Sequence, residues 1–107
     1  MSNYISNPED QKLATLATST LARTGAKQAA ALRDTTGRTY VAINISAPTL
    51  TLDAVQAVFT VAAASQIAGI ESVVIAGDKT AMTAIITDNS PLATIFHIDV
   101  NGGVTRA

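Results

Sequence analysis

The run from Leu50 to Gly69 constrains the fold most, because it reads as a helix that is apolar on nearly every side. Its apolar residues recur at helical spacing, at Val55, Val58, Phe59, Ala62, Ala63 and Ile67. Leu52 and Val61 lie off that stripe and are apolar as well. Thr51 suits the N-cap, Asp53 the positive end of the helix, and Gly69 its end. The pattern predicts a central helix that is packed on nearly every side.

The length of the chain indicates one domain over residues 1–107. Its composition indicates that this domain buries part of its apolar surface against further copies of the chain. Apolar residues make up 48% of the chain and charged residues only 14%, against a usual quarter for charged residues. A monomer with so few charges would leave broad apolar patches in water, so we expect a homodimer or homotetramer.

Charge and the absent residue types exclude several classes of protein. The net charge is −1 and the seven basic residues are scattered, which argues against nucleic acid as a partner. The chain has no cysteine, so disulfides and thiolate metal sites are excluded. Neither a leader nor an apolar run long enough to span a bilayer is visible, so we expect a cytoplasmic protein without a membrane partner.

Around the central helix, the pattern predicts an α/β fold. Asn7-Pro8 begins a helix that Gly25 ends. Strands are predicted over 28–33, 39–45, 72–76 and 94–100; the first two form an antiparallel hairpin around a turn at 34–37, and the third is buried on both faces. The segment 46–49 reads as a linker, and 78–89 fits either a short helix that Asp78 caps or a strand. This order implies a mixed sheet with helices on both faces.

Several of these segments resemble the zinc-dependent cytidine deaminase family. Family members carry a segment like F-x-V-G-A-A-L, a D-G turn, a strand that leads into N-V-E-N, and C-A-E at the start of the central helix. Here Ala26–Leu32 (AKQAAAL), Thr36-Gly37, Tyr40–Ser46 (YVAINIS) and Asp53-Ala54-Val55 follow that course. The likeness covers about half of the chain, from Lys27 to Asp78. It implies a three-layer α/β/α sandwich with a mixed sheet opened by an antiparallel hairpin.

The resemblance also implies which functional residues are missing. The family holds zinc with one Cys or His at the central helix and a P-C-x-x-C pair, and a Glu moves protons while zinc-bound hydroxide attacks the pyrimidine. Here Asp53 stands at the first ligand position and Val55 at that of the Glu. The P-C-x-x-C pair matches either 79–83 or 91–95, and neither supplies a ligand. A valine cannot transfer a proton, and one carboxylate cannot hold zinc alone.

The sequence therefore predicts a catalytically inactive member of this family, with no catalytic residue, no metal and no cofactor. Its function would be that of an oligomeric binding or structural module, for a partner protein or a small nucleoside-like ligand. The alternative is a cytidine deaminase-type hydrolase with an atypical site.

The expected ligand-binding residues are the remains of the family's pocket: Asn44, Ser46 and Asp53. Asn44 matches a nucleoside contact of the family, whereas Ser46 replaces its ribose-binding Glu and Ala26 its stacking aromatic. Asn44 and Asp53 each have a simpler structural explanation as well. Asn44 could tie down the loop after its strand, and Asp53 could serve the helix dipole. His97, the only histidine, has no second metal ligand near it in the sequence.

Overall fold

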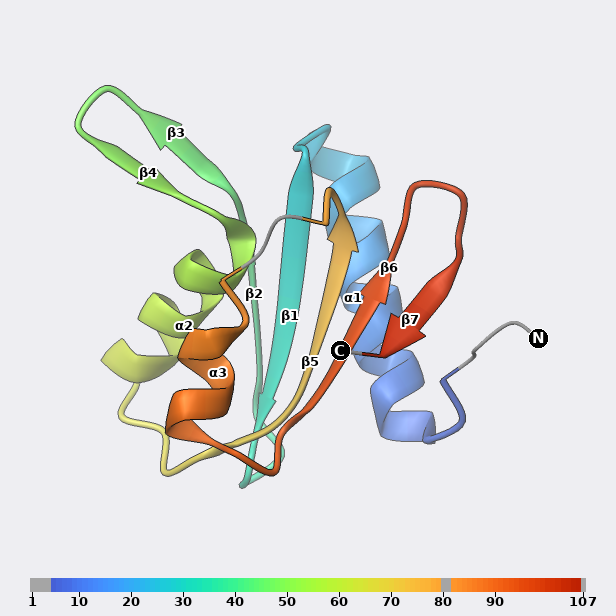
Figure 1. The fold of residues 1–107 in the computed structure, drawn as a ribbon, viewed down its shortest axis with the longest axis vertical. Coiled ribbons are helices and arrows are strands. Elements are labelled where there is room, and N and C mark those ends of the chain that lie inside the picture. The colour runs from blue at the N-terminus through green and yellow to red at the C-terminus, as the bar shows by residue number, and fades with distance from the viewer. Residues whose placement is uncertain (1–4, 80–81, 107) are drawn as a thin grey trace.

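A five-stranded mixed sheet forms the middle layer of the molecule (Figure 1). The computed structural model describes residues 5–79 and 82–106. The strands are β1 (Gln28–Asp34), β2 (Thr39–Ile43), β5 (Ile70–Gly77), β6 (Thr94–Ile98) and β7 (Val104–Arg106). Their order is β2-β1-β5-β6-β7, in which β5 and β6 are parallel and the other neighbours antiparallel. The predicted hairpin of the first two strands and the buried 72–76 strand are confirmed.

Helices cover both faces of this sheet, which confirms the predicted three-layer α/β/α arrangement (Figure 1). On one face lies α1 (Pro8–Thr24), whose N-cap Asn7 accepts a hydrogen bond from Glu9 N and which Gly25 ends at φ 66°. On the other face lie α2 (Ala54–Ala64) and α3 (Ala84–Asn89). All seven residues of β1 are buried, and its Ala29–Ala31 run lets both layers approach closely.

The turn between β1 and β2 depends on the carboxylate of Asp34. Its Oδ1 accepts hydrogen bonds from Thr36 N, Thr36 Oγ1 and Arg38 N, at 2.9, 2.7 and 3.0 Å. Burial acts to raise the pKa of Asp34, but these hydrogen bonds outweigh it and hold the pKa below its usual value. The turn is therefore fixed by a carboxylate that stays ionised.

The central helix differs from its prediction in length and in burial. It begins after Asp53 rather than after Thr51, and it ends at Ala64, five residues before Gly69. Asp53 and Gln56 form a capping box, which decides the start. One face of α2 packs on the sheet, but Val61 on its outer side is 46% exposed. The prediction of burial on nearly every side is wrong, because no further layer of the described chain covers that face.

A second, two-stranded sheet replaces the predicted linker at 46–49. Its strands are β3 (Ile45–Ala47) and β4 (Leu50–Leu52), which pair as a hairpin around Pro48-Thr49. The hairpin projects from the main sheet beyond the end of β2 (Figure 1). The alternation of Ile-Ser-Ala and Leu-Thr-Leu fits strand geometry, and the predicted 39–45 strand breaks at Asn44 to allow it.

In the C-terminal half, the structure decides between the helix and the strand that the sequence allowed for residues 78–89. Residues 84–89 are helical, so the helix alternative for 78–89 holds, although Asp78 does not cap it. The last predicted strand is present as β6 and is shorter, and the unpredicted β7 follows it. No helix in the described residues is long and apolar enough to cross a membrane.

Candidate functional site

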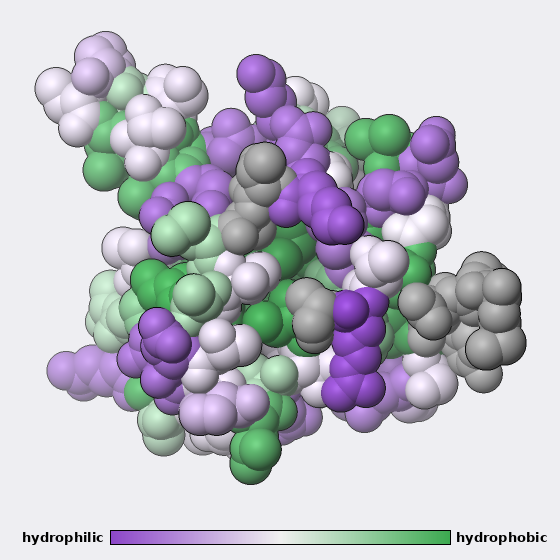
Figure 2. All heavy atoms as spheres, viewed as in Figure 1, coloured by the Kyte–Doolittle hydropathy of each residue, from purple (hydrophilic) through white to green (hydrophobic). Residues whose placement is uncertain are grey.

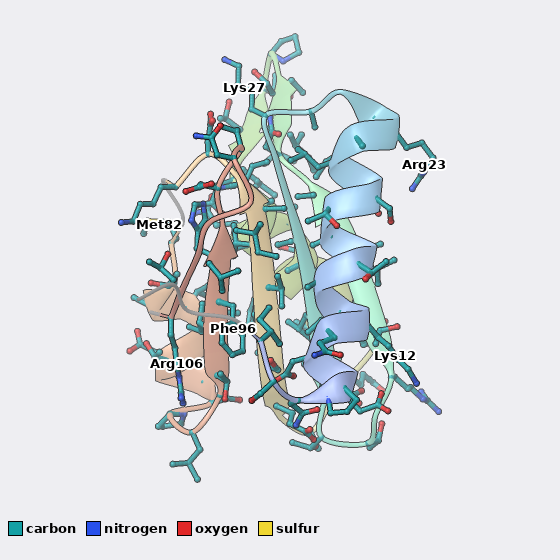
Figure 3. The ribbon with its side chains drawn as sticks, turned by 90° about the vertical axis from the view of Figure 1, so that its right-hand side faces the viewer. Lys12, Arg23, Lys27, Met82, Phe96 and Arg106 are labelled. Atoms are coloured by element: carbon teal, nitrogen blue, oxygen red, sulfur yellow. The ribbon has the colours of Figure 1, made fainter. Side chains whose placement is uncertain are left out.

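The three residues predicted to bind a ligand line one hollow, between the start of β1 and the β3–β4 hairpin. This hollow, the Asn44 hollow, has a volume of about 410 Å³. Its lining residues are Gly25, Ala26, Lys27, Gln28, Asn44, Ile45, Ser46, Thr51, Leu52, Asp53 and Asp78. The structure therefore brings Asn44, Ser46 and Asp53 together. Lys27 lies at the same end of the molecule as the hairpin (Figure 3).

A buried glutamine that the sequence analysis did not single out organises the floor of this hollow. The Oε1 atom of Gln28 accepts a hydrogen bond from Ala54 N, the first backbone amide of α2, at 2.7 Å. Its Nε2 atom donates to Asp78 O, just beyond β5, also at 2.7 Å. Gln28 thus fastens the start of α2 to the end of β5, and it is the only polar residue among the first five of β1.

Asn44 fixes the end of β2 against β1. Its Oδ1 accepts a hydrogen bond from Gln28 N at 3.1 Å, and its own N donates to Gln28 O at 3.2 Å. The alternative role that the sequence suggested, a tie to the following loop, is replaced by a tie to the neighbouring strand. The half-buried Asn44 thereby marks the point where the chain leaves the main sheet for the hairpin.

Both carboxylate oxygens of Asp53 are engaged by backbone amides. Oδ1 accepts from Gln56 N at 2.8 Å, and Gln56 Oε1 accepts from Asp53 N at 3.0 Å, which completes the capping box. Oδ2 accepts from Met82 N, also at 2.8 Å. Asp53 therefore joins the start of α2 to the segment that leads into α3. Val55, two residues further on, is fully buried in the core.

The contact between Asp53 and Met82 distinguishes the two segments that match the family's P-C-x-x-C pair. Residues 91–95 follow α3 and enter β6, and Ile95 is buried there. Residues 79–83 directly precede α3, and Met82 among them touches the start of α2. Thr80 and Ala81 lie outside the described residues. Of the two matching segments, the structure therefore brings 79–83, through Met82, to the residue at the first ligand position.

The described residues contain no group of three or more His, Asp or Glu side chains placed to hold a metal ion. His97 lies in β6, and its Nε2 is 2.8 Å from Gly77 O. Ala26 and Ser46, which stand at the stacking and ribose-binding positions of the family, both line the Asn44 hollow.

Comparison with known proteins bears out the resemblance. A protein-family model described as Cytidine deaminase-like matches residues 6–102, which is nearly the whole chain. The match extends well beyond the segments that carried the resemblance and takes in α1, α3 and β6. A search of curated proteins found no match. The chain belongs to the cytidine deaminase-like family.

Proposed function

We propose that this chain is a binding module of its family that works without zinc and without deamination. It would hold a small polar ligand of nucleoside size in the Asn44 hollow, as a homo-oligomer. The observation that carries this proposal is the engagement of both carboxylate oxygens of Asp53, the residue at the position of the first zinc ligand. With backbone amides at 2.8 Å from each of its oxygens, this carboxylate acts as a link between two helix starts.

The surroundings of Asp53 support the same proposal. One oxygen of this carboxylate caps α2 and the other holds the segment before α3, so Asp53 has a structural task that is complete without a metal ion. The Glu that moves protons in the family is replaced by Val55, whose side chain is buried in the core. No group at that position can accept or donate a proton, and the described residues bring no set of zinc ligands together, so both observations favour a function other than deamination.

The Asn44 hollow suits a small ligand in size and chemistry. Its volume of about 410 Å³ lies within the usual range for small-molecule sites. The lining includes a positive charge from Lys27, a negative charge from Asp78 and the hydroxyl group of Ser46. It also includes apolar surface from Ile45 and Leu52. Such a lining matches an uncharged or zwitterionic ligand with one apolar face.

A titration followed by NMR would test ligand binding in this hollow. We expect cytidine or a related nucleoside to shift the backbone amide signals of Lys27, Asn44 and Asp53 in a saturable way. Ser46→Trp should abolish the shifts, because the indole fills the hollow from β3. Ser19→Trp, on the exposed side of α1, is the matched control and should leave them intact. Shifts that survive Ser46→Trp would place any binding elsewhere, and no saturable shift with any nucleoside would refute the ligand class.

Purified protein is expected to contain no stoichiometric zinc and to leave cytidine and deoxycytidine unchanged. The reason is the engaged Asp53 carboxylate together with Val55 at the proton-transfer position. Elemental analysis would measure zinc per chain, and an ultraviolet assay would follow conversion to uridine. A zinc-containing deaminase of the family serves as the positive control. One equivalent of zinc that survives dialysis, or turnover above a heat-denatured sample, would favour the alternative of a hydrolase with an atypical site.

Assembly is expected to involve the β3–β4 hairpin. Residues 39–52 contain no charged side chain, and Ile45 and Leu50 of the hairpin are 36% and 51% exposed. Figure 2 shows the hairpin without strongly hydrophilic residues. A hairpin of such short strands is marginal in water by itself, so burial against a second copy would stabilise it. The interface should exceed about 1,000 Å².

Light scattering coupled to size exclusion should give a multiple of the 11.0 kDa chain mass at micromolar concentration. Leu50→Lys should lower that mass to one chain. Leu92→Lys changes a 97% exposed leucine far along the chain, in the turn after α3, and should leave the mass unchanged. A constant mass of one chain for the unmodified protein at every concentration would contradict assembly. Equal dissociation by both variants would show that the hairpin is not the interface.

A further inference from the structure

A second hollow lies over the C-terminal half of β5, β6 and β7, on the face of the sheet that carries α3. It has a volume of about 300 Å³ and shares no lining residue with the Asn44 hollow. Ile75 and Ile95 form an apolar floor, and both side chains are nearly fully buried. Lys79, His97 and Arg106 contribute the basic groups of its lining. We call it the His97 hollow.

The ring of His97 is held in one orientation inside this hollow. His97 is only 9% exposed and stands beside Ile75 on one side and Thr105 on the other. Its Nε2 lies 2.8 Å from Gly77 O. A carbonyl oxygen only accepts hydrogen bonds, so Nε2 carries the hydrogen. The other ring nitrogen, Nδ1, has no hydrogen-bond partner among the described residues and remains available to a ligand.

The charged side chains that line the hollow are all of one sign, and a nearby carboxylate, that of Asp99 beyond the end of β6, lies outside the lining and accepts hydrogen bonds from Asn101 N and Gly103 N. Neither Lys79 nor Arg106 forms an ion pair with any described residue, and the lining contains no carboxylate. Both residues are exposed, and both line the hollow. Arg106 lies on the same side of the molecule as α3, away from α1 (Figure 3). In a chain whose net charge is −1, this hollow is locally positive.

We propose that the His97 hollow binds an organic anion, meaning a carboxylate or phosphate group carried on a compact apolar body. The apolar body would rest on Ile75 and Ile95, and Lys79 and Arg106 would neutralise the anionic group. The hydroxyl groups of Thr83 and Thr105, which also line the hollow, can donate hydrogen bonds to its oxygens. This site is independent of the ligand proposed for the Asn44 hollow, and either can exist without the other.

The test uses four probes on the full chain: phenyl phosphate, benzoate, inorganic phosphate and benzyl alcohol. The readout is the ring signal of His97 and the amide signals of Thr83 and Thr105 in NMR titrations. Phenyl phosphate or benzoate should shift these signals in a saturable way, and the better of the two identifies the anionic group. Inorganic phosphate should bind at least about tenfold more weakly, because it lacks an apolar body, and benzyl alcohol should cause no saturable shift.

Matched double variants separate a local site from the effect of net charge. Lys79→Gln with Arg106→Gln should weaken the binding about tenfold, because two exposed charge pairs are lost. Lys12→Gln with Arg23→Gln removes the same charge from α1 and should change it less than about twofold. Both double variants change exposed residues, so their thermal melts should match that of the unmodified protein. The proposal is overturned if neither organic anion gives a saturable shift up to about 10 mM, or if the two double variants weaken binding equally.

Discussion

Val58→Asp is expected to prevent folding. Val58 is fully buried on the face of α2 that packs against the sheet, in the cluster that also holds Val55, Val73 and Ile75. An unpaired carboxylate in that position costs several kcal/mol, a large share of a total stability of about 5 to 15 kcal/mol. Circular dichroism of the purified variant should show no cooperative thermal transition.

The same helix provides the control. Val61→Asp introduces the same group three residues further on, at a side chain that is 46% exposed, and should leave a cooperative melt close to that of the unmodified protein. A folded Val58→Asp with an unchanged melt would contradict the position of α2 against the sheet. Phe59 is only half-buried, so Phe59→Asp should lie between the two.

Arg33→Met is expected to lower the free energy of unfolding by about 3 to 5 kcal/mol, because it leaves a buried charge without its partner. Arg33 is 5% exposed, and its Nη2 lies 2.8 Å from Asp10 Oδ1 of α1 and 2.8 Å from Glu71 Oε1 of β5. Burial acts to lower the pKa of Arg33, but its hydrogen bonds with Glu71 and its charge interactions with Asp10 and Glu71 outweigh it and hold the pKa above its usual value. Asp10 is itself buried, and Arg33 is the basic side chain that the described residues pair with it.

Urea unfolding of two further variants would show that the loss comes from Asp10. Arg33→Met combined with Asp10→Leu removes both charges and should recover most of the stability, since an apolar pair of similar size replaces a buried ion pair at little cost. Arg38→Met removes an exposed arginine from the nearby turn and should change the free energy of unfolding by less than about 0.5 kcal/mol. Equal losses in Arg33→Met and in the double variant would contradict the role of Asp10.

Elements with strong local signals could be predicted from the sequence, whereas those that depend on distant contacts could not. The first helix carries its own start and stop in Asn7-Pro8 and Gly25, and both hold in the structure. The strand at 72–76 is marked by a continuous apolar run. The β3–β4 hairpin and β7 have only three residues per strand, too few for a period to be visible. The start of α2 was misplaced because Thr51 and Asp53 are both good caps, and only the Gln56 contact decides between them.

Some residues of the candidate site could likewise be predicted from the sequence, and others could not. Asn44, Ser46 and Asp53 could be placed in one pocket because they follow the family's motif positions. Gln28 could not, because the side-chain contacts that define its role lie 26 and 50 residues further along the chain. A single polar residue at the head of an alanine-rich strand was the one available signal. The His97 hollow was also invisible, because the register of three strands and the lead into α3 assemble it.

The two hollows meet at the residues that directly follow β5. Asp78 lines the Asn44 hollow, and the next residue, Lys79, lines the His97 hollow. The side-chain amide of Gln28 donates a hydrogen bond to Asp78 O and accepts one from Ala54 N, in the first turn of α2. Removal of the Gln28 side-chain amide would therefore loosen one wall of each hollow at the same time.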